Sequence, residues 1–405
     1  MTELALEGIR VADFSWVWAG PLCTRYLASM GAQVIKIESR QRPDQFRAGA
    51  AKDKEGNPLW NQAPNFNLLN YSKLSTSLNL SRPEGIALAK QIVAISDIVV
   101  ENFGTGAMER MGLSYEELKV LRPGVIMVSS SGFGQTGPLA GYAAYGSAIQ
   151  SYSGINHITG YRGQPPRGIG GAFSDPLTGT TELFGVLAAL YQRQLTGEGQ
   201  HLDLSMVEAT VAHLPEAVLD YLINGRDQGP QGNDEDGLAP HGVYRCAGDD
   251  TWIAIAVQNE EEWQGFCRAL GNPLWAAEKK YTDASSRWQN RKELDHHVEA
   301  WTKDRDRFQA MEILQQEGVP SGPVFDARDV AEDPHMRERG LFVELDHPEL
   351  GPKLYVGHPW KLLPDDNARY ERPPLLGEHS EYVYKDLLGM NDEKFDRLVQ
   401  QKIIF

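Results

Sequence analysis

Asp175 is the residue of this 405-residue chain whose type and surroundings best suit a covalent nucleophile. It precedes Pro176 and an apolar run over residues 177–190, and Pro is favoured in the first turn of a helix. The carboxylate would therefore stand at a helix N-terminus, where free N–H groups and the helix dipole favour an anion. Held beside the glycines that precede it, such a carboxylate can act as a nucleophile. An ordinary helix N-cap is the alternative that these residues leave open.

Positive charge is scarce in this chain, whose formal net charge is −16 at pH 7. This balance argues against a nucleic-acid partner, because binding to phosphates needs a basic face. An anionic ligand would need local groups of basic residues instead. The candidates are Arg40 with Arg42, Lys73, Arg110, and Arg162 with Arg167. For each of them a solvated surface cation is the alternative.

Alternating strand and helix signals over the first 135 residues indicate the framework that positions these groups. Buried strands are expected at residues 9–14, 33–37, 97–100 and 125–129, and helices at residues 20–30 and 83–94. This alternation predicts βαβ units and a mainly parallel sheet. Ligands of such sheets bind beyond the carboxyl ends of the strands, so the loops that follow these strands are the candidate site.

The rest of the chain indicates a second, smaller domain. The Asp175 helix is expected to run to about residue 194, before a strand at residues 201–206. A loop rich in Gly, Asp, Gln and Pro then precedes two short strands and several amphipathic helices. We therefore predict an α/β fold with a large, open, parallel-sheet (Rossmann-like) domain and a small α+β domain. The expected boundaries are 1–222 for the large domain, 223–325 for the small domain and 326–405 for a C-terminal return to the large domain.

Motifs of several common functions are absent from the sequence. No GxGxxG follows the first strand, and no GxxxxGK[ST], GxSxG or HExxH occurs. The three cysteines, Cys23, Cys246 and Cys267, show no metal-ligand spacing. No apolar run is long enough to cross a bilayer, and no signal-peptide pattern is seen. We expect a cytoplasmic protein with reduced thiols, no metal and no membrane partner.

Several segments, taken in order, resemble the blocks of one known family. They are residues 11–15 with 19–21, 31–38, 70–73, 78–85, 97–104 with 110–112, 174–179, 197–200, 322–324 and 374–379. Residues 97–112 are similar to the block DVxxENFxxGxxxRxG, with Ile98 in place of the Val. By these motifs the chain is identified as a member of the class III CoA-transferases, which include formyl-CoA and carnitine CoA-transferases. The resemblance covers nearly the whole chain.

The resemblance implies a specific reaction. Asp175 falls on the nucleophilic aspartate of the family, whose members move CoA from an acyl-CoA to a free carboxylic acid through covalent aspartyl intermediates. CoA thioesters are substrates in that reaction, and no tightly bound cofactor is expected. The family also implies that two chains interlock, as a homodimer or as a hetero-oligomer with a related subunit.

The same resemblance assigns residues that bind CoA. They are Val17, Trp18, Ala19, Arg40, Leu78, Asn79, Leu80, Asn102, Phe103, Gly104, Arg110, Tyr145 and Gly146. Trp18 and Ala19 match positions at the pantetheine and thiol end, and Arg110 matches a phosphate partner. Arg40 lies one place after the family's basic residue, where this chain has Ser39. Tyr145 and Gly146 match a pair beside the nucleophile.

Two residues are candidates for contact with the substrate acid. Arg167 precedes the nucleophile and could bind a second carboxylate, which suggests succinyl-CoA as donor and malate, citramalate or benzylsuccinate as acceptor. Gly237 belongs to residues 233–238, a reduced form of the glycine-rich lid of formyl-CoA transferase, and could let the backbone approach closely.

Two other functions stay open at this point. An α-methylacyl-CoA racemase is similar in sequence, but it carries a Gly-His-Asp set where residues 140–143 have neither His nor Asp. Tyr142 would replace it poorly, because the pKa of Tyr lies far from neutral. A non-catalytic CoA-binding subunit of a hetero-oligomer is the third possibility, although Asp175 is present.

Overall fold

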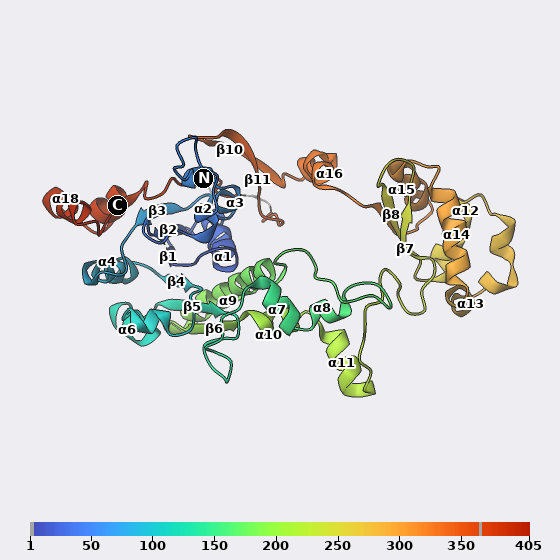
Figure 1. Cartoon of the computed structure of the whole chain (residues 1–405), viewed down its shortest axis with the longest axis horizontal. Coiled ribbons are helices and arrows are strands. Elements are labelled where there is room, and N and C mark those ends of the chain that lie inside the picture. Colours follow the sequence, from blue (N-terminus) through green and yellow to red (C-terminus); the bar gives the residue numbers. More distant parts are fainter. Residues whose placement is uncertain (1–3, 364–366) are drawn as a thin grey trace. The chain divides into compact units, whose positions relative to one another are not determined.

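A computed structural model describes residues 4–363 and 367–405 of the chain. The chain divides into two compact units (Figure 1). The large unit comprises residues 1–156, 168–226 and 337–405, and the small unit comprises residues 157–167 and 227–336. The short segment 157–167 belongs to the small unit although no signal in the sequence separates it from its neighbours.

The large unit is built on a six-stranded sheet with the strand order β3-β2-β1-β4-β5-β6. The strands are β1 (Arg10–Asp13), β2 (Gln33–Glu38), β3 (Leu74–Ser77), β4 (Ile98–Glu101), β5 (Ile126–Ser131) and β6 (His201–Ser205). Every neighbouring pair is parallel. The strand order reverses between β1 and β4, and ligands of such sheets bind beyond the strand ends at this switch point. The prediction of an α/β fold with an open parallel sheet is confirmed.

Apolar residues bury both faces of this sheet, as a parallel sheet requires. Val11 packs on one face with residues of α1 (Ala19–Ser29) and α9 (Ser174–Thr196). Ala12, its neighbour in β1, packs on the other face with residues of α4 (Pro83–Ala94) and of the C-terminal α18 (Asp392–Gln400). Successive side chains of a strand point to opposite faces, so one short apolar run supports both layers.

Helix ends follow from local sequence. Pro83 opens α4, and Ser114 forms a capping box with Glu117 at the start of α6 (Tyr115–Leu121). Gly197 ends α9 with a left-handed φ of +77°. The other elements assigned wholly to the large unit are α2 (Gln45–Ala48), η1 (Trp60–Gln62), α3 (Pro64–Asn70), α5 (Ala107–Arg110), α7 (Gly146–Tyr152), α10 (Met206–Val211), α11 (Pro215–Asn224), β10 (Phe342–His347), β11 (Gly351–Val356) and the π-helix η4 (Tyr382–Leu387). α8 (Ile155–Ile158) and α17 (Pro334–Glu338) span the points where the chain passes between units.

The edge strand β3 is absent from the expected strands. Three of its four residues are Ser or Thr, so it lacks the apolar pattern of the other strands. Hydrogen bonds from distant residues stabilise it instead: Ser75 Oγ donates to Glu38 Oε1 at 2.6 Å, and Ser77 N donates to Ser380 Oγ at 3.2 Å. These contacts are far apart in sequence, and the local pattern does not reveal them.

The small unit is an α+β structure. Its antiparallel sheet has the order β7-β8-β9, with strands β7 (His241–Arg245), β8 (Trp252–Ala256) and β9 (Ser321–Pro323). Ile253 and Ile255 pack with Trp263 and Phe266 of α12 in its core. Its helices are α12 (Glu260–Ala269), η2 (Leu274–Ala277), η3 (Lys279–Tyr281), α13 (Ala284–Gln289), α14 (Arg291–Thr302), α15 (Arg307–Gln316) and α16 (Ala327–Glu332). No helix within residues 4–363 and 367–405 has both the length and the apolar character of a membrane span.

Candidate active site

A cavity of about 830 Å³ lies in the large unit beyond the carboxyl ends of β1, β4 and β5. Its lining includes residues 16–18 after β1, residues 102–105 after β4, and residues 130–132 at the end of β5. Asp175, in the first turn of α9, completes the group. The strand order therefore places the cavity at the position that the parallel sheet predicts for a ligand.

Asp175 is not the N-cap of its helix. α9 begins at Ser174, Phe173 occupies the N-cap position, and no side chain caps this end. Asp175 instead donates its backbone N–H to Ala172 O at 3.0 Å and turns its half-buried carboxylate toward the cavity. The N-cap interpretation is therefore wrong, and the carboxylate is left for another role.

Burial alone sets the electrostatics of this carboxylate. It raises the pKa of Asp175 from 3.8 to about 6, and no hydrogen bond or ion pair within the described residues contributes to the shift. At pH 7 roughly nine-tenths of such a group is ionised. A carboxylate that is ionised but poorly solvated retains its reactivity, because few donors compete for its lone pairs.

Position 146 requires a glycine, because its backbone lies close to the side chain of Asp175. A Cβ placed on Gly146 would lie 2.6 Å from Asp175 Oδ2 and 3.0 Å from Ala172 Cβ. Any other residue would displace the carboxylate or the backbone that carries it. Tyr145, which precedes it, is largely exposed and accepts a hydrogen bond from Gln45 Nε2 at 3.2 Å.

The loop after β1 is fixed by two side chains. Trp16 N donates to Asn102 Oδ1 at 2.7 Å, and Asn102 Nδ2 returns a bond of 2.7 Å to Trp16 O. Val17 N donates to Asp44 Oδ2 at 3.1 Å, and Val17 has the left-handed φ of +66° that a β-branched residue rarely adopts. Val17 and Trp18 of this strained loop line the cavity, and the two hydrogen bonds of Asn102 hold the loop in place.

Lys73 does not serve as an anion site. It is buried and donates to Asp13 Oδ2 at 3.1 Å, and it also bonds to Thr24 and Asn70. Burial lowers the pKa of Lys73 to about 8. Burial alone would raise the pKa of Asp13, but Lys36, Lys73 and two hydroxyl groups outweigh it and hold that pKa below its usual range. Both interpretations of Lys73, as an anion ligand and as a surface cation, are wrong.

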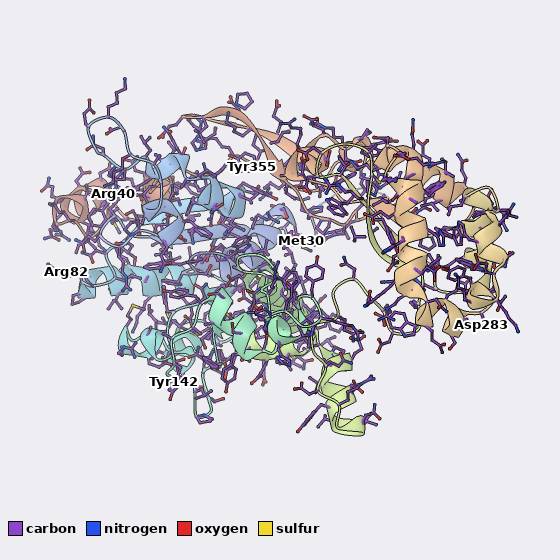
Figure 2. All side chains as sticks on the ribbon, turned by 45° about the vertical axis from the view of Figure 1, so that its right-hand side comes forward. Met30, Arg40, Arg82, Tyr142, Asp283 and Tyr355 are labelled. Carbon is purple, nitrogen blue, oxygen red and sulfur yellow. The ribbon has the colours of Figure 1, made fainter. Side chains whose placement is uncertain are left out.

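Two arginines supply the positive charge of the cavity lining. They are Arg110, which is one of the predicted CoA contacts, and Arg42, which is not among those contacts. The Arg42 guanidinium lies 5.4 Å from the centroid of the Trp16 ring, which packs edge-on at 5.5 Å against Phe103. Arg40, which is labelled in Figure 2, is exposed and is not among the residues that line the cavity. Guanidinium groups and flat rings are the groups that a phosphorylated purine contacts.

The structure brings together most of the predicted CoA-binding residues. Those that line the cavity are Val17, Trp18, Leu80, Asn102, Phe103, Gly104, Arg110, Tyr145 and Gly146. Those that do not are Ala19, Arg40, Leu78 and Asn79. Leu78 is fully buried in the core, and Asn79 bonds to Ser81 and to the C-terminal segment. Other lining residues lie outside the predicted CoA-binding set, namely Gln45, Phe46, Asn65, Thr105, Ala107, Met111, residues 130–132, 142–144 and 147, Gly171, Ala172 and Met206.

The two candidate substrate residues, Arg167 and Gly237, belong to the small unit. Arg167 is exposed, and its Nη2 donates to Gln164 Oε1 at 3.3 Å. Arg162 differs, since it pairs with Asp234 and Asp236. Gly237 has a φ of +87°, which favours glycine at that turn.

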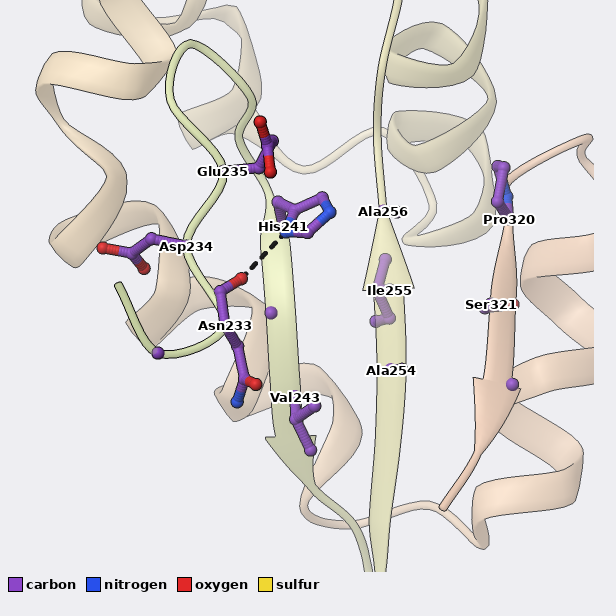
Figure 3. A pocket seen from close by; sticks show the side chains of 13 residues that line it. Asn233, Asp234, Glu235, His241, Val243, Ala254, Ile255, Ala256, Pro320 and Ser321 are labelled. Carbon is purple, nitrogen blue, oxygen red and sulfur yellow. Dashed lines mark hydrogen bonds between the residues drawn. The ribbon is translucent and has the colours of Figure 1, made fainter. Parts of the chain in front are cut away.

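A second cavity, of about 490 Å³, lies in the small unit (Figure 3). It is lined by β7, β8 and β9 and by the loop that carries Asp234 and Glu235, and His241 Nδ1 lies 2.8 Å from Asn233 O. Its lining holds these two carboxylates and neither Arg nor Lys. Phosphate groups fit this environment poorly, so the cavity of the large unit suits CoA better. No cluster of His, Cys, Asp and Glu that could hold a metal ion occurs within the described ranges.

Part of the stretch 140–143, where a racemase carries its Gly-His-Asp set, lies at the cavity of the large unit. Tyr142 and Ala143 contribute to its lining, and within the described residues this lining contains no His. Asp175 is the one carboxylate among these lining residues. The cavity thus offers a carboxylate without the imidazole that α-proton transfer needs near neutral pH.

Comparison with known proteins identifies the family of this chain. The model of CoA-transferase family III matches residues 6–380. A succinyl-CoA–D-citramalate CoA-transferase of Chloroflexus aurantiacus is 33% identical over 399 residues, which are 98% of each chain. A formyl-CoA:oxalate CoA-transferase of Rhodopseudomonas palustris is 32% identical over 410 residues, covering 96% of this chain and 95% of the relative.

The crystal structure of a CAIB/BAIF family protein from Brucella suis has the same fold. It matches with a TM-score of 0.85 and 30% sequence identity, over 95% of this chain and 100% of that one. The resemblance inferred from the sequence motifs is therefore confirmed. The chain belongs to CoA-transferase family III and is a CoA-transferase, whose substrates are CoA thioesters.

Proposed function

We propose that this enzyme transfers CoA from succinyl-CoA to a dicarboxylic acid through covalent intermediates on Asp175. The observation that carries the proposal is the Asp175 carboxylate itself, which lines the cavity of about 830 Å³ with its pKa raised by burial to about 6. The space left by Gly146 admits its oxygen atom. A weakly solvated carboxylate at such a place is suited to attack a thioester carbonyl.

The reaction balances without a proton or a redox partner. Asp175 Oδ attacks the thioester carbonyl of the donor, the C–S bond breaks, and a mixed anhydride and CoA thiolate form. The thiolate attacks the aspartyl carbonyl, which releases the donor acid and leaves an aspartyl-CoA thioester. The acceptor carboxylate attacks this thioester and releases CoA thiolate. The thiolate then attacks the acceptor acyl carbon of the new anhydride, and this step restores the Asp175 carboxylate.

The cavity lining supports this sequence of steps. Arg42 and Arg110 are the cations that would bind the phosphates, and Trp16 and Phe103 offer rings on which adenine can stack. The strained loop at Val17 and Trp18 would hold the pantetheine end beside Asp175. Trp18, which lines the cavity, would help to exclude water from the anhydride.

The choice of a dicarboxylic acid rests on chemistry and on relatives. The relatives from C. aurantiacus and R. palustris are named for the acceptors citramalate and oxalate, and both acids carry two carboxylates. The two relatives are named for different donors, succinyl-CoA and formyl-CoA, and their sequence identities to this chain are nearly equal, at 33% and 32%. Arg167 bonds to a neutral amide, so its positive charge is suited to a second carboxylate of the substrate. No observation favours a racemase or a non-catalytic subunit.

A direct assay tests the proposal. Succinyl-CoA is incubated with single acids from a panel of dicarboxylates and matched monocarboxylates, and new acyl-CoA species are identified by mass. We expect transfer to at least one dicarboxylate and far slower transfer to the monocarboxylate of the same length. Asp175→Asn is expected to abolish transfer. Transfer to monocarboxylates alone, or full activity in the Asn variant, would reject the proposal.

A further inference from the structure

A group of buried polar atoms under the cavity lacks hydrogen-bond partners. Within the described residues, neither carboxyl oxygen of Glu182 has a partner, and the same holds for Ser130 Oγ, Ser131 Oγ and Ser174 Oγ. Glu182 and Ser130 are each 1% exposed. Nearly all buried polar groups in folded proteins are paired, so several orphan atoms around one site require an explanation.

These atoms come from the elements that form the active site. Glu182 lies on the buried face of α9, two helical turns after Asp175. Ser130 and Ser131 end β5, and both line the cavity. Ser130 therefore lies between the interior, where Glu182 is, and the space that a substrate would fill.

Acidic groups surround Glu182 on neighbouring elements. The pKa of Glu182 is raised from 4.5 to about 8, first by burial and also by the charges of Asp13 on β1, Glu101 on β4 and Asp175, while the Ser130 hydroxyl lowers it. Cys23 on α1 also faces Glu182, and burial raises the pKa of that thiol well above its usual value. The nearby cation Lys73 is paired with Asp13.

We propose that Glu182 is a positioning residue that, as a neutral acid, donates a hydrogen bond to Ser130 Oγ and turns the Ser130 hydroxyl proton toward the cavity. There the hydroxyl donates to the oxygen of the thioester or anhydride carbonyl as negative charge develops on it. The inference rests on the proposed function, because it takes the Asp175 cavity as the place of acyl transfer.

The direction of the hydrogen bond follows from the number of protons. A serine hydroxyl has one proton, so an oxygen that accepts from Glu182 has its own proton free for another acceptor. If Glu182 were ionised, its carboxylate would accept a hydrogen bond from the Ser130 hydroxyl. That hydroxyl would then no longer donate toward the cavity. A second negative charge near Asp175 would also oppose the approach of an anionic acid. Donors aimed at a developing oxyanion lower the barrier to acyl transfer.

Isotope exchange measures the effect without knowledge of the acceptor. Succinyl-CoA is mixed with labelled succinate, and label in the thioester is followed by mass as a function of pH. We expect the wild-type kcat to fall on the alkaline side with an apparent pKa near 8. Glu182→Gln should remove this fall, because its amide N–H can donate to Ser130 at every pH. Ser130→Ala should lower kcat about 100-fold with little change in KM.

Infrared spectra provide a readout that does not depend on turnover. A protonated carboxyl band that titrates near pH 8 is expected in the wild type and in the matched control Glu101→Gln, and it should be absent from Glu182→Gln. Burial also raises the pKa of Glu101, to about 7, so this control separates the two acids. Unfolding curves of each variant show that it is folded.

The outcomes separate this inference from the proposed function. Exchange in the wild type, with an unchanged alkaline fall in Glu182→Gln or wild-type kcat in Ser130→Ala, would overturn the inference alone. A wild type that exchanges no label would contradict the succinyl-CoA proposal. In that case loss of the band in Glu182→Gln would still support a neutral Glu182, and its persistence would refute it.

Discussion

Gly146 and Asp175 approach so closely that a Cβ on Gly146 would lie 2.6 Å from Asp175 Oδ2. The two residues are 29 positions apart in the chain and belong to different helices, α7 and α9. Because Gly146 has no Cβ, the carboxylate of the proposed nucleophile can occupy this position. This relationship connects the packing of the large unit to its chemistry.

Gly146→Ala is predicted to reduce the rate of CoA transfer about 100-fold, because the new methyl group displaces the carboxylate by a fraction of a bond length. The overpacking should lower the free energy of unfolding by about 1–3 kcal/mol. Steady-state rates and denaturant unfolding measure the two effects. Gly141→Ala is the control, since a Cβ at Gly141 meets open space. A Gly146→Ala enzyme as fast as the control would show that the contact is unimportant.

Asp175→Asn is predicted to stabilise the fold at pH 7 while it abolishes activity. Burial raises the pKa of Asp175 to about 6, above the value of 3.8 for the unfolded chain, so its stabilising contribution is complete below about pH 4 and is lost as pH rises through 6. After allowance for partial solvent exposure, the gain should be about 1–2 kcal/mol at pH 7 and near zero at pH 4.

Denaturant unfolding at the two pH values checks this sign. Asp249→Asn, at an exposed position of the small unit, is the control and should change little at either pH. A destabilised Asp175→Asn protein at pH 7 would mean that the carboxylate is held by favourable contacts, contrary to its surroundings in the structure.

Arg167→Ala is predicted to raise the KM for a dicarboxylic acceptor at least tenfold more than the KM for a monocarboxylic one. A lost contact between a guanidinium and a carboxylate removes binding that only the diacid enjoys. Arg162→Ala is the matched control, because Arg162 pairs with Asp234 and Asp236 instead. Equal changes of KM for both acids in Arg167→Ala would exclude a carboxylate clamp.

The chain is predicted to form a dimer of twice its 45.0 kDa mass. Phe184, Tyr191 and Leu195 lie exposed along α9, and Leu222 and Ile223 lie exposed on α11. Groups of exposed apolar side chains mark protein–protein interfaces. Light scattering measures the mass. Phe184→Glu should weaken the dimer, and Leu274→Glu, at an exposed apolar residue of the small unit, should not. A monomeric wild-type chain would contradict this prediction.

The sequence predicts the central part of the fold well. β1, β2, β4 and β5 are short apolar runs with strong local signals, so their positions agree with the structure to within about two residues. Local sequence patterns do not predict β3, because Ser75 and Ser77 are stabilised by Glu38 and Ser380, which are distant in sequence. Residues 157–167 join the small unit for a similar reason, through contacts such as Gly232 N to Gly160 O.

The candidate site likewise has residues that the sequence predicts and residues whose place depends on distant parts of the chain. Asp175, Trp18, Phe103 and Arg110, which the family motifs assign to the site, all line one cavity. The family motifs do not include Arg42, which the sequence offers only as a basic neighbour of Arg40 and which lies over the Trp16 ring at the cavity. Residue type alone could not distinguish the buried, paired Lys73 from a ligand-binding cation, because its partner Asp13 lies 60 positions earlier.

The central claim is that the side chain of Asp175 becomes acylated. The most direct measurement is to quench the enzyme after brief mixing with succinyl-CoA, trap the intermediate with hydroxylamine or borohydride, and determine the mass of the peptide that contains residue 175. A hydroxamate or an alcohol at Asp175 is expected in the wild type, and an unmodified peptide is expected in Asp175→Asn. An unmodified Asp175 in an enzyme that is turning over would contradict this claim.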